Sequence, residues 1–310
     1  MTYSDTTVQF NYNYTMPNFR KDPKITVTDG SSFSLKDFDT TYTAGMPDEA
    51  QAKTDLLHDI EKNAKRQERL YAESKRSILI IFQAIDAAGK DSTIKHVMTG
   101  QNPSGISVTN FKKPSNLELA HDFLWRTTIA LPSRGMMGIF NRSYYEEVLV
   151  CKVHPELILG QKLPNINFVK DIDDDFWEKR YESITDFEKH LHRNGTIILK
   201  FFLHVSKEEQ KKRLLERIND PEKKWKFKSA DLLERDRWKD YMLAYEQMIT
   251  ATATEKAPWF IIPADNKWFM QLAVGDIIHD TLKSLDPIFP VFDKTKSAEF
   301  AAAKKKLLEE

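Results

Sequence analysis

The feature that most constrains this chain is a short apolar run that ends in a turn of small residues. The run is Ile78–Phe82, five apolar residues rich in β-branched types, which predicts a strand buried on both faces. The turn occupies Gln83–Ser92, after which Ile94, Val97 and Met98 return at helical spacing. A strand, a tight loop and a helix in this order place backbone amides at the start of a helix, where they point at an anion.

The turn resembles a phosphate-binding loop, with departures. Gly89 and Lys90 stand where the Gly-Lys pair of the pattern G-x-x-x-x-G-K-[ST] falls. Ala84 replaces the first Gly of that pattern, and Asp91 stands at the Ser/Thr position, just before Ser92. The alternative is an ordinary strand-to-helix turn that carries a surface lysine. As a phosphate site, the loop would use the following residues: Ala87, Ala88, Gly89, Lys90, Asp91 and Ser92.

Asp86 is the unusual member of this loop, because it places a carboxylate inside an anion site. Such a loop needs a cation between its own negative charge and the ligand. Asp86 therefore predicts a Mg²⁺ ion that bridges the protein to phosphate oxygens. Lys90 would reach the terminal phosphates from the same loop.

Composition limits the classes of protein that this chain can represent. With 310 residues, 41% of them hydrophobic and 11% aromatic, the chain can bury the core of one large α/β domain or of two modest ones. The 46 basic and 46 acidic side chains cancel, so the net charge indicates neither a nucleic acid nor a membrane as a partner. Any anion site must come from a local cluster of cations.

The single cysteine and the hydropathy pattern favour a cytoplasmic protein. Cys151 alone excludes an internal disulfide framework. We interpret Cys151 as structural and not as a nucleophile, because it has no recognisable catalytic partner. The sequence has no signal-peptide pattern and no apolar run near the roughly 18 residues that a membrane helix needs.

The order of patterns along the chain predicts one doubly wound, largely parallel α/β domain over 47–290. Residues 1–46 are polar without a period, which predicts an extended arm that packs on the domain or on a neighbouring subunit, and 291–310 form a C-terminal tail. We expect strands at 78–82, 106–111, 139–143, 196–203 and 258–263, and helices at 47–74, 115–126, 144–154, 155–163, 176–192, 231–253, 267–285 and 298–310.

The carboxyl ends of the strands carry the ligand site in sheets of this kind. This rule places four polar residues on one rim: Asp86, Lys112, Asn141 and Asp265. Arg142 follows a strand directly and offers a planar fork for bidentate phosphate contact. Arg126, at the end of the helix that Ser115 begins, could present another.

A lysine-rich stretch between two charged helices predicts a lid over about 207–235. It includes Arg213 and Arg217, which we expect to bind phosphate; for any single residue here, a solvated helix face is the alternative. The cations gathered near this rim exceed what one nucleoside triphosphate requires. They favour a longer polyanion as the ligand.

Several short motifs occur in a specific order: Gln83–Asp91, Asn102–Pro103, Phe111–Pro114, Leu124–Arg126, Leu131–Pro132, Phe140–Tyr145 and Pro263–Trp268. Together they resemble the polyphosphate kinase 2 family over about 45–285. The resemblance implies a P-loop three-layer α/β/α fold similar to thymidylate kinase, with a parallel sheet and a helical lid. It also implies reversible, Mg²⁺-dependent transfer of the terminal phosphoryl group between inorganic polyphosphate and nucleotides, by direct in-line transfer without a phosphoenzyme.

Carried over by position, the resemblance implies three catalytic residues: Asp86 as the metal-organising residue, Lys90 as the essential lysine and Arg142 at a Walker B-like strand end. It implies a nucleotide site made of Lys113, Arg126, Asn141 and Arg142. Asn141 stands where many members have Asp, as in the subgroup that phosphorylates both nucleoside monophosphates and diphosphates. AMP, ADP and ATP are the expected nucleotides, with guanine nucleotides as further candidates, and a homodimer or homotetramer is the expected assembly.

Three residues depart from the family pattern: Met136, Asn266 and Gln271. We expect Met136 to be the departure closest to the active rim. Two alternatives stay open, an ATP-dependent nucleoside monophosphate kinase and a catalytically silent phosphate-binding or scaffold protein.

Overall fold

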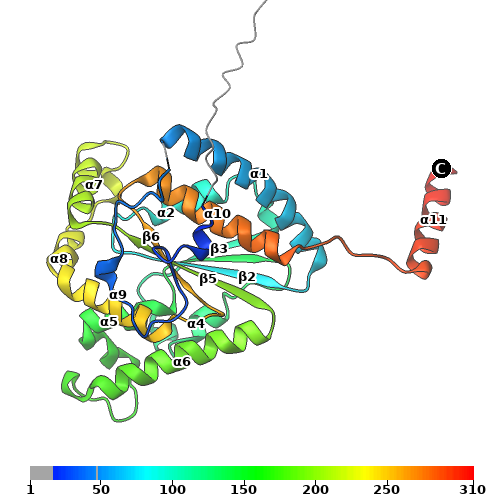
Figure 1. The fold of residues 1–310 in the computed structure, drawn as a ribbon. Helices are drawn as coiled ribbons and strands as arrows, with labels where there is room; N and C mark the ends of the chain where they lie inside the picture. Colours follow the sequence, from blue (N-terminus) through cyan, green and yellow to red (C-terminus); the bar gives the residue numbers. More distant parts are fainter. Residues whose placement is uncertain (1–16, 47) are drawn as a thin grey trace, which may run out of the picture.

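The computed structural model describes residues 17–46 and 48–310. Its centre is a six-stranded sheet with the order β1-β6-β5-β2-β4-β3. The strands are β1 (Thr26–Val27), β2 (Ser77–Gln83), β3 (Ile106–Asn110), β4 (Met137–Asn141), β5 (Thr196–His204) and β6 (Trp259–Pro263). Helices cover both faces of the sheet, with α1, α2 and α10 on one side and α5, α6 and α9 on the other (Figure 1). The three-layer α/β/α architecture is therefore confirmed.

The helices of the described residues are α1 (Glu49–Glu73), α2 (Lys90–Val97), α3 (Asn116–Leu119), α4 (Trp125–Thr128), α5 (Val150–Val153), α6 (Asp174–Arg193), α7 (Lys207–Asn219), α8 (Ala230–Asp236), α9 (Trp238–Thr252), α10 (Lys267–Leu285) and α11 (Lys294–Leu308). Short 3₁₀ helices are η1 (Phe19–Lys21), η2 (Leu35–Asp37), η3 (Pro103–Gly105), η4 (Tyr144–Val148), η5 (Pro155–Gln161), η6 (Val169–Asp171) and η7 (Lys224–Lys226). Among the described residues, no helix combines the length and apolar character that crossing a membrane requires.

The central position of β2 in the sheet explains the apolar run Ile78–Phe82 in its sequence. All seven residues of β2 are buried, and it pairs in parallel with β4 on one side and with β5 on the other. Phe82 of β2 stacks on Phe201 of β5 with 5.2 Å between ring centroids. Because parallel strands share a direction, the carboxyl ends of β2, β4 and β5 meet at one edge of the sheet.

The N-terminal segment makes the sheet mixed. β1 pairs antiparallel with β6, and Thr26 lies opposite Phe260. Phe19 and Ile25 of this segment are fully buried. Residues 17–46 therefore pack on the parent domain, one of the two placements expected for the arm; the rest of the predicted arm, residues 1–16, lies outside the described residues.

Two stretches are less helical than their patterns predicted. The capping box of Ser115 and Glu118 is present, but the helix ends at Leu119. The Asp122 carboxylate accepts a hydrogen bond from the Leu124 amide, and this side chain–backbone bond replaces a helical one before α4 begins. Residues 144–163 form 3₁₀ turns around the short α5 instead of two α-helices.

Candidate active site

The loop between β2 and α2 has the geometry of an anion cradle. Ala87 and Gly89 have φ values of +65° and +112°, so the backbone turns sharply through the left-handed region twice. A Cβ on Gly89 would lie 3.0 Å from the Met270 side chain, so both the space and the backbone favour glycine here. The turn brings the first amides of α2 to the carboxyl edge of the sheet.

A cavity of about 970 Å³ opens above this edge. The residues that we predicted from sequence and that line it are Asp86, Ala87, Ala88, Gly89, Lys90, Asp91, Ser92, Lys112, Asn141, Arg142, Arg213 and Arg217. The opposite wall comes from the predicted lid, with Trp225 and Lys226 of η7 and Asp231 and Glu234 of α8. The loop, two strand ends and the lid thus enclose one space.

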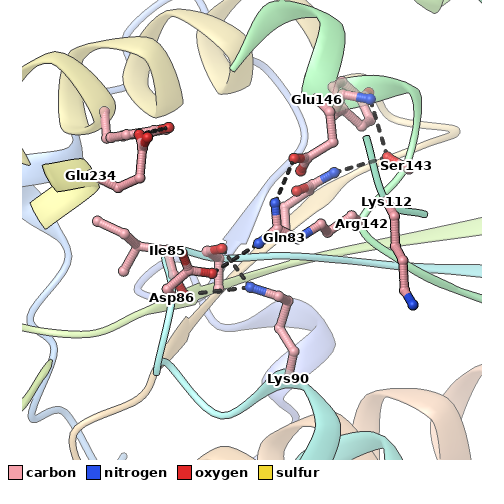
Figure 2. Close-up of polar contacts among 12 residues, drawn as sticks. Gln83, Ile85, Asp86, Lys90, Lys112, Arg142, Ser143, Glu146 and Glu234 are labelled. Atoms are coloured by element: carbon pink, nitrogen blue, oxygen red, sulfur yellow. Dashed lines mark hydrogen bonds and ion pairs between the residues drawn. The ribbon is translucent and has the colours of Figure 1, made fainter. Parts of the chain in front are cut away.

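Arg142 lies between two carboxylates in this cavity (Figure 2). Its Nη2 is 2.8 Å from Asp86 Oδ1 and its Nη1 is 3.0 Å from Glu146 Oε2. Glu146 above all, and then Asp86, raises the pKa of the guanidinium above its usual range. The pair of contacts fixes the planar fork at the end of β4, where its φ of +66° also turns the backbone. Sequence reasoning missed Glu146, although its position four residues after Arg142 is the spacing of a local ion pair.

The Lys90 side chain folds back onto the main chain of its own loop. Its Nζ donates to the carbonyl oxygens of Ala84 at 2.6 Å and Ile85 at 3.4 Å. Burial, together with the nearby charge of Arg142, lowers the pKa of Lys90 to about 8. Lys90 lines the cavity, and among the described residues no carboxylate lies within ion-pair distance of its ammonium.

Asp86 and Asp91 are the acidic residues of the loop, and both line the cavity. Asn141 Nδ2 donates to Asp91 Oδ1 and to Asn110 Oδ1, each at 2.8 Å. Within the described residues, no group of three or more His, Cys, Asp or Glu side chains could hold a metal ion alone. One or two carboxylates completed by water and substrate phosphates are the usual donors to Mg²⁺, so this donor set fits the predicted ion.

Two side chains of helix α7 hold the main chain of the loop by hydrogen bonds. Gln210 Nε2 donates to the Asp86 carbonyl oxygen at 2.9 Å, and Arg213 Nη1 donates to that of Ala88 at 2.6 Å. Arg213 also binds the Ala264 carbonyl oxygen and is only 4% exposed. Its donors thus face the main chain, which is a different role from the phosphate contact that we predicted. No local sequence pattern indicates this role for Gln210, a neutral side chain in a highly charged helix.

Three predicted residues lie outside the cavity lining. Arg126 is buried, with its Nη1 on the Lys112 carbonyl oxygen at 2.7 Å and its guanidinium over the Phe111 ring. Lys113 is exposed beside it. The Asp265 carboxylate accepts from the Ser206 amide at 2.8 Å and so fixes the start of α7. Arg126 and Asp265 have structural partners where we expected ligand contacts.

The expectation for Met136 was wrong. Met136 precedes β4, so it lies at the amino end of the strand, opposite to the cavity. Asn266 caps α10 and donates to the Thr41 carbonyl oxygen. Of the three departures from the family pattern, Gln271 is the one that lines the cavity.

Comparisons with known proteins agree with this geometry. The family model described as polyphosphate kinase 2 matches residues 46–290. The chain is 50% identical over 254 residues to an ADP-polyphosphate phosphotransferase of Rhodopseudomonas palustris, which covers 82% of this chain and 86% of the relative. It is 42% identical over 268 residues to an AMP/ADP-polyphosphate phosphotransferase of Meiothermus ruber, with 86% and 95% covered.

A solved structure shows the same fold. The crystal structure of polyphosphate kinase 2 from Arthrobacter aurescens superposes with a TM-score of 0.81 at 39% sequence identity, over 90% of this chain and 95% of that one. The family match agrees with three features of the chain: the ordered motifs, the three-layer fold and the loop at the carboxyl edge of the sheet. The chain belongs to the polyphosphate kinase 2 family.

Proposed function

We propose that this protein transfers the terminal phosphoryl group of inorganic polyphosphate to AMP and to ADP, giving ADP and ATP, and that the reaction is reversible. The observation that carries the proposal is the single cavity in which Asp86, Lys90 and Arg142 meet a lid that bears Lys226 and Lys228. The relatives from Rhodopseudomonas and Meiothermus, whose names specify polyphosphate with ADP or with AMP and ADP, support this substrate pair.

In the proposed reaction, some residues align the phosphate groups and others neutralise their charge. The loop amides and Lys90 would hold the phosphate oxygens, and the fork of Arg142 would bind the transferred group from the β4 side. When bound, Mg²⁺ would neutralise charge on the phosphates, with Asp86 as its main protein ligand and Asp91 beside it. The lid would exclude water, so that the acceptor nucleotide and not water receives the phosphoryl group.

Direct transfer is the mechanism that this set of residues favours. Among the described residues, His96 is the histidine that lines the cavity, and its Nδ1 bonds the Ser92 carbonyl oxygen at 2.7 Å. That contact ties the ring to the backbone of its own helix, and among the described residues no carboxylate pairs with the ring to activate it. We therefore assign no phosphoenzyme, and the charged groups act on the transferring phosphoryl group itself.

Phosphorus NMR separates the candidate functions. We expect polyphosphate with AMP and Mg²⁺ to yield ADP and then ATP, while ATP with AMP and no polyphosphate yields ADP far more slowly. The reverse pattern would identify an ATP-dependent nucleoside monophosphate kinase. Binding of polyphosphate without turnover would identify a silent phosphate-binding protein. Replacing AMP with GMP in the same assay tests guanine nucleotides, and light scattering tests the proposed homodimer or homotetramer.

A further inference from the structure

Gln210 lies where the lid and the phosphate-binding loop meet. Its side chain is 1% exposed and uses both ends of its amide. Nε2 donates to the Asp86 carbonyl oxygen at 2.9 Å, while Oε1 accepts from Arg235 Nη1 at 2.6 Å. Arg235 belongs to α8, the helix that carries Glu234 and Asp231 into the opposite wall of the cavity.

The contact with Asp86 bears on the most strained part of the loop. The carbonyl group of Asp86 precedes Ala87, whose φ of +65° is unfavourable for a residue with a Cβ. Such a conformation persists when its neighbours hold it, and here two side chains of α7 bind the carbonyl groups on either side of Ala87. Gln210 holds that of Asp86, and Arg213 holds that of Ala88.

Gln210 and Arg213 are themselves held in place by different parts of the molecule. Arg213 is fixed by Glu209 of its own helix and by the main chain at Ala264, so its position does not depend on α8. The amide of Gln210 is oriented by Arg235, because a guanidinium can only donate and so requires the oxygen end of the amide. Arg235 is in turn held on α7 by the Lys207 carbonyl oxygen at 2.8 Å.

We propose that Gln210 is a positioning residue that couples helix α8 of the lid to the loop that carries Asp86. With α8 in place, Arg235 orients the amide and Nε2 holds the main chain of Asp86. When α8 moves away, the amide loses its orientation and the loop loses its lid-dependent anchor. The main chain that carries the Asp86 carboxylate is then fully anchored only when α8 is in place, while the carboxylate itself stays paired with Arg142. This inference rests on the proposed phosphoryl transfer for its catalytic consequence, but the coupling itself is a property of the chain.

Three substitutions separate the two ends of this contact. Gln210→Glu keeps an acceptor for Arg235 but removes the donor to the Asp86 carbonyl oxygen. Gln210→Leu removes both contacts, and Arg235→Met removes the α8 end while keeping an apolar stem. The matched control is Arg237→Met, because Arg237 donates to the Val153 carbonyl oxygen and, within the described residues, forms no hydrogen bond or ion pair with the loop or with Gln210.

Kinetics with polyphosphate, AMP and Mg²⁺ give the first readout. Loss of one buried hydrogen bond predicts a fall in kcat of about tenfold for Gln210→Glu and Gln210→Leu, and a higher Mg²⁺ concentration for half-maximal rate, with a smaller change in KM for AMP. Gln210→Leu combined with Arg235→Met should be no slower than the slower single variant, since both act through one contact chain. Arg237→Met should match the unsubstituted enzyme.

Hydrogen exchange of the loop gives the second readout and needs no activity. We expect peptides that cover residues 84–90 to exchange faster in Arg235→Met than in Arg237→Met, at matched thermal stability. Unchanged exchange at 84–90 in Arg235→Met, or a kcat within twofold of the unsubstituted enzyme in Gln210→Glu, would overturn the proposal. If the unsubstituted enzyme transfers nothing from polyphosphate, the proposed function fails, while the exchange comparison still decides the coupling. Should Gln210→Leu fail to fold, Gln210→Glu and Arg235→Met decide it.

Discussion

Lys90 is a cation whose pKa this fold lowers. Its pKa is lowered to about 8, first by burial and then by Arg142. In the free enzyme the ammonium is charged below pH 8 and loses its charge above it, so the affinity for phosphate falls as pH rises through that value. We expect kcat/KM for polyphosphate, which reports groups of the free enzyme, to decline above about pH 8.

Two variants of Lys90 test this assignment. Lys90→Ala should lose transfer by about 10³-fold, as when a main stabilising donor is removed, while circular dichroism and thermal unfolding stay unchanged. In Lys90→Arg the cation stays charged at every accessible pH, so the decline above pH 8 should disappear even if the rate is lower. A decline that is the same in Lys90→Arg would assign the basic limb to another group, and near-normal turnover of Lys90→Ala would refute its catalytic role.

Asn141 occupies a position where an Asp would add a carboxylate to the proposed metal site. Its amide bridges Asp91 and Asn110, so Asn141→Asp would replace a donor by a carboxylate that faces Asp91. The added carboxylate is a further oxygen ligand for Mg²⁺. We expect a lower Mg²⁺ concentration for half-maximal rate and a changed ratio of AMP to ADP phosphorylation, measured in initial-rate assays.

The control for this variant is Asn194→Asp, at the end of α6 and away from the cavity. It should leave both quantities unchanged. If Asn141→Asp leaves Mg²⁺ dependence and substrate preference as they were, Asn141 has no part in metal binding or nucleotide choice.

Single residues were predictable where the local pattern alone sets their position. Asp86 and Lys90 follow a buried strand directly, so the loop pattern was enough to place them in the cavity. Arg126 is separated from the end of β3 by helix α3, and it packs over Phe111. Gln210 contacts Asp86 and Arg235, which are distant from it in sequence. Those contacts depend on how elements meet, which no local pattern contains.

At the level of elements, the packing of α1 against α10 buries two carboxyl groups. Asp59 is 4% exposed and Asp276 is 6% exposed, and Oδ2 of each has no hydrogen-bond partner in the part of the chain that the structure describes. Burial raises the pKa of Asp59 to about 7 and that of Asp276 to about 8. The charged or titratable groups near the pair are Asp55, His58, Lys62, Arg66, His279, Asp280 and Lys283.

The sign of the resulting pH dependence follows from linkage. The unfolded pKa of Asp is about 3.9, so between about pH 4 and pH 8 the folded state binds more protons than the unfolded state. The free energy of unfolding therefore falls as pH rises through this range. Asp276→Asn removes one of these titrations and should raise the unfolding temperature by roughly 3 °C at pH 9, with a smaller gain at pH 6.

Differential scanning fluorimetry of Asp276→Asn at pH 6, 7, 8 and 9 measures this effect. The exposed Asp236 supplies the control, and Asp236→Asn should shift the unfolding temperature equally little at each pH. An Asp276→Asn shift that is the same at pH 6 and pH 9 would mean that the carboxyl group does not titrate in this range.

A helix or strand could be predicted from sequence when the residues within that element are enough to determine it. The buried strands β2, β5 and β6 carry apolar runs, which Lys200 alone interrupts in β5. The long helices α1 and α10 carry apolar residues at helical spacing, and the structure has all five elements near the expected bounds. The break between α3 and α4 depends on one side-chain bond of Asp122. The break at Arg237 has no helix-breaking residue to announce it, whereas the 3₁₀ turns of 144–163 include Pro155, which we interpreted as the start of a second helix.

For the molecule as a whole, the segment before α1 is part of the packed domain. The Leu35 amide donates to Glu246 of α9 at 2.9 Å, and Thr40 Oγ1 donates to Asp265 at 2.9 Å. Asp265 also holds the start of α7, so this segment touches the base of the lid. The sequence did not reveal this arrangement, because a polar stretch without periodicity carries no signal for the surface that it covers.

At Gly30 the segment approaches α9 most closely. A Cβ at this position would lie 2.0 Å from the Thr250 carbonyl oxygen, and a helix backbone cannot yield as a flexible side chain can. Gly30→Ala should therefore lower stability by about 2 kcal/mol, which corresponds to roughly 5 °C in unfolding temperature. The control is Gly160→Ala, whose Cβ would meet Leu119 at 3.9 Å and should leave the unfolding temperature within roughly 1 °C. If Gly30→Ala unfolds at the same temperature as Gly160→Ala, the N-terminal segment packs on the domain too loosely to support the lid.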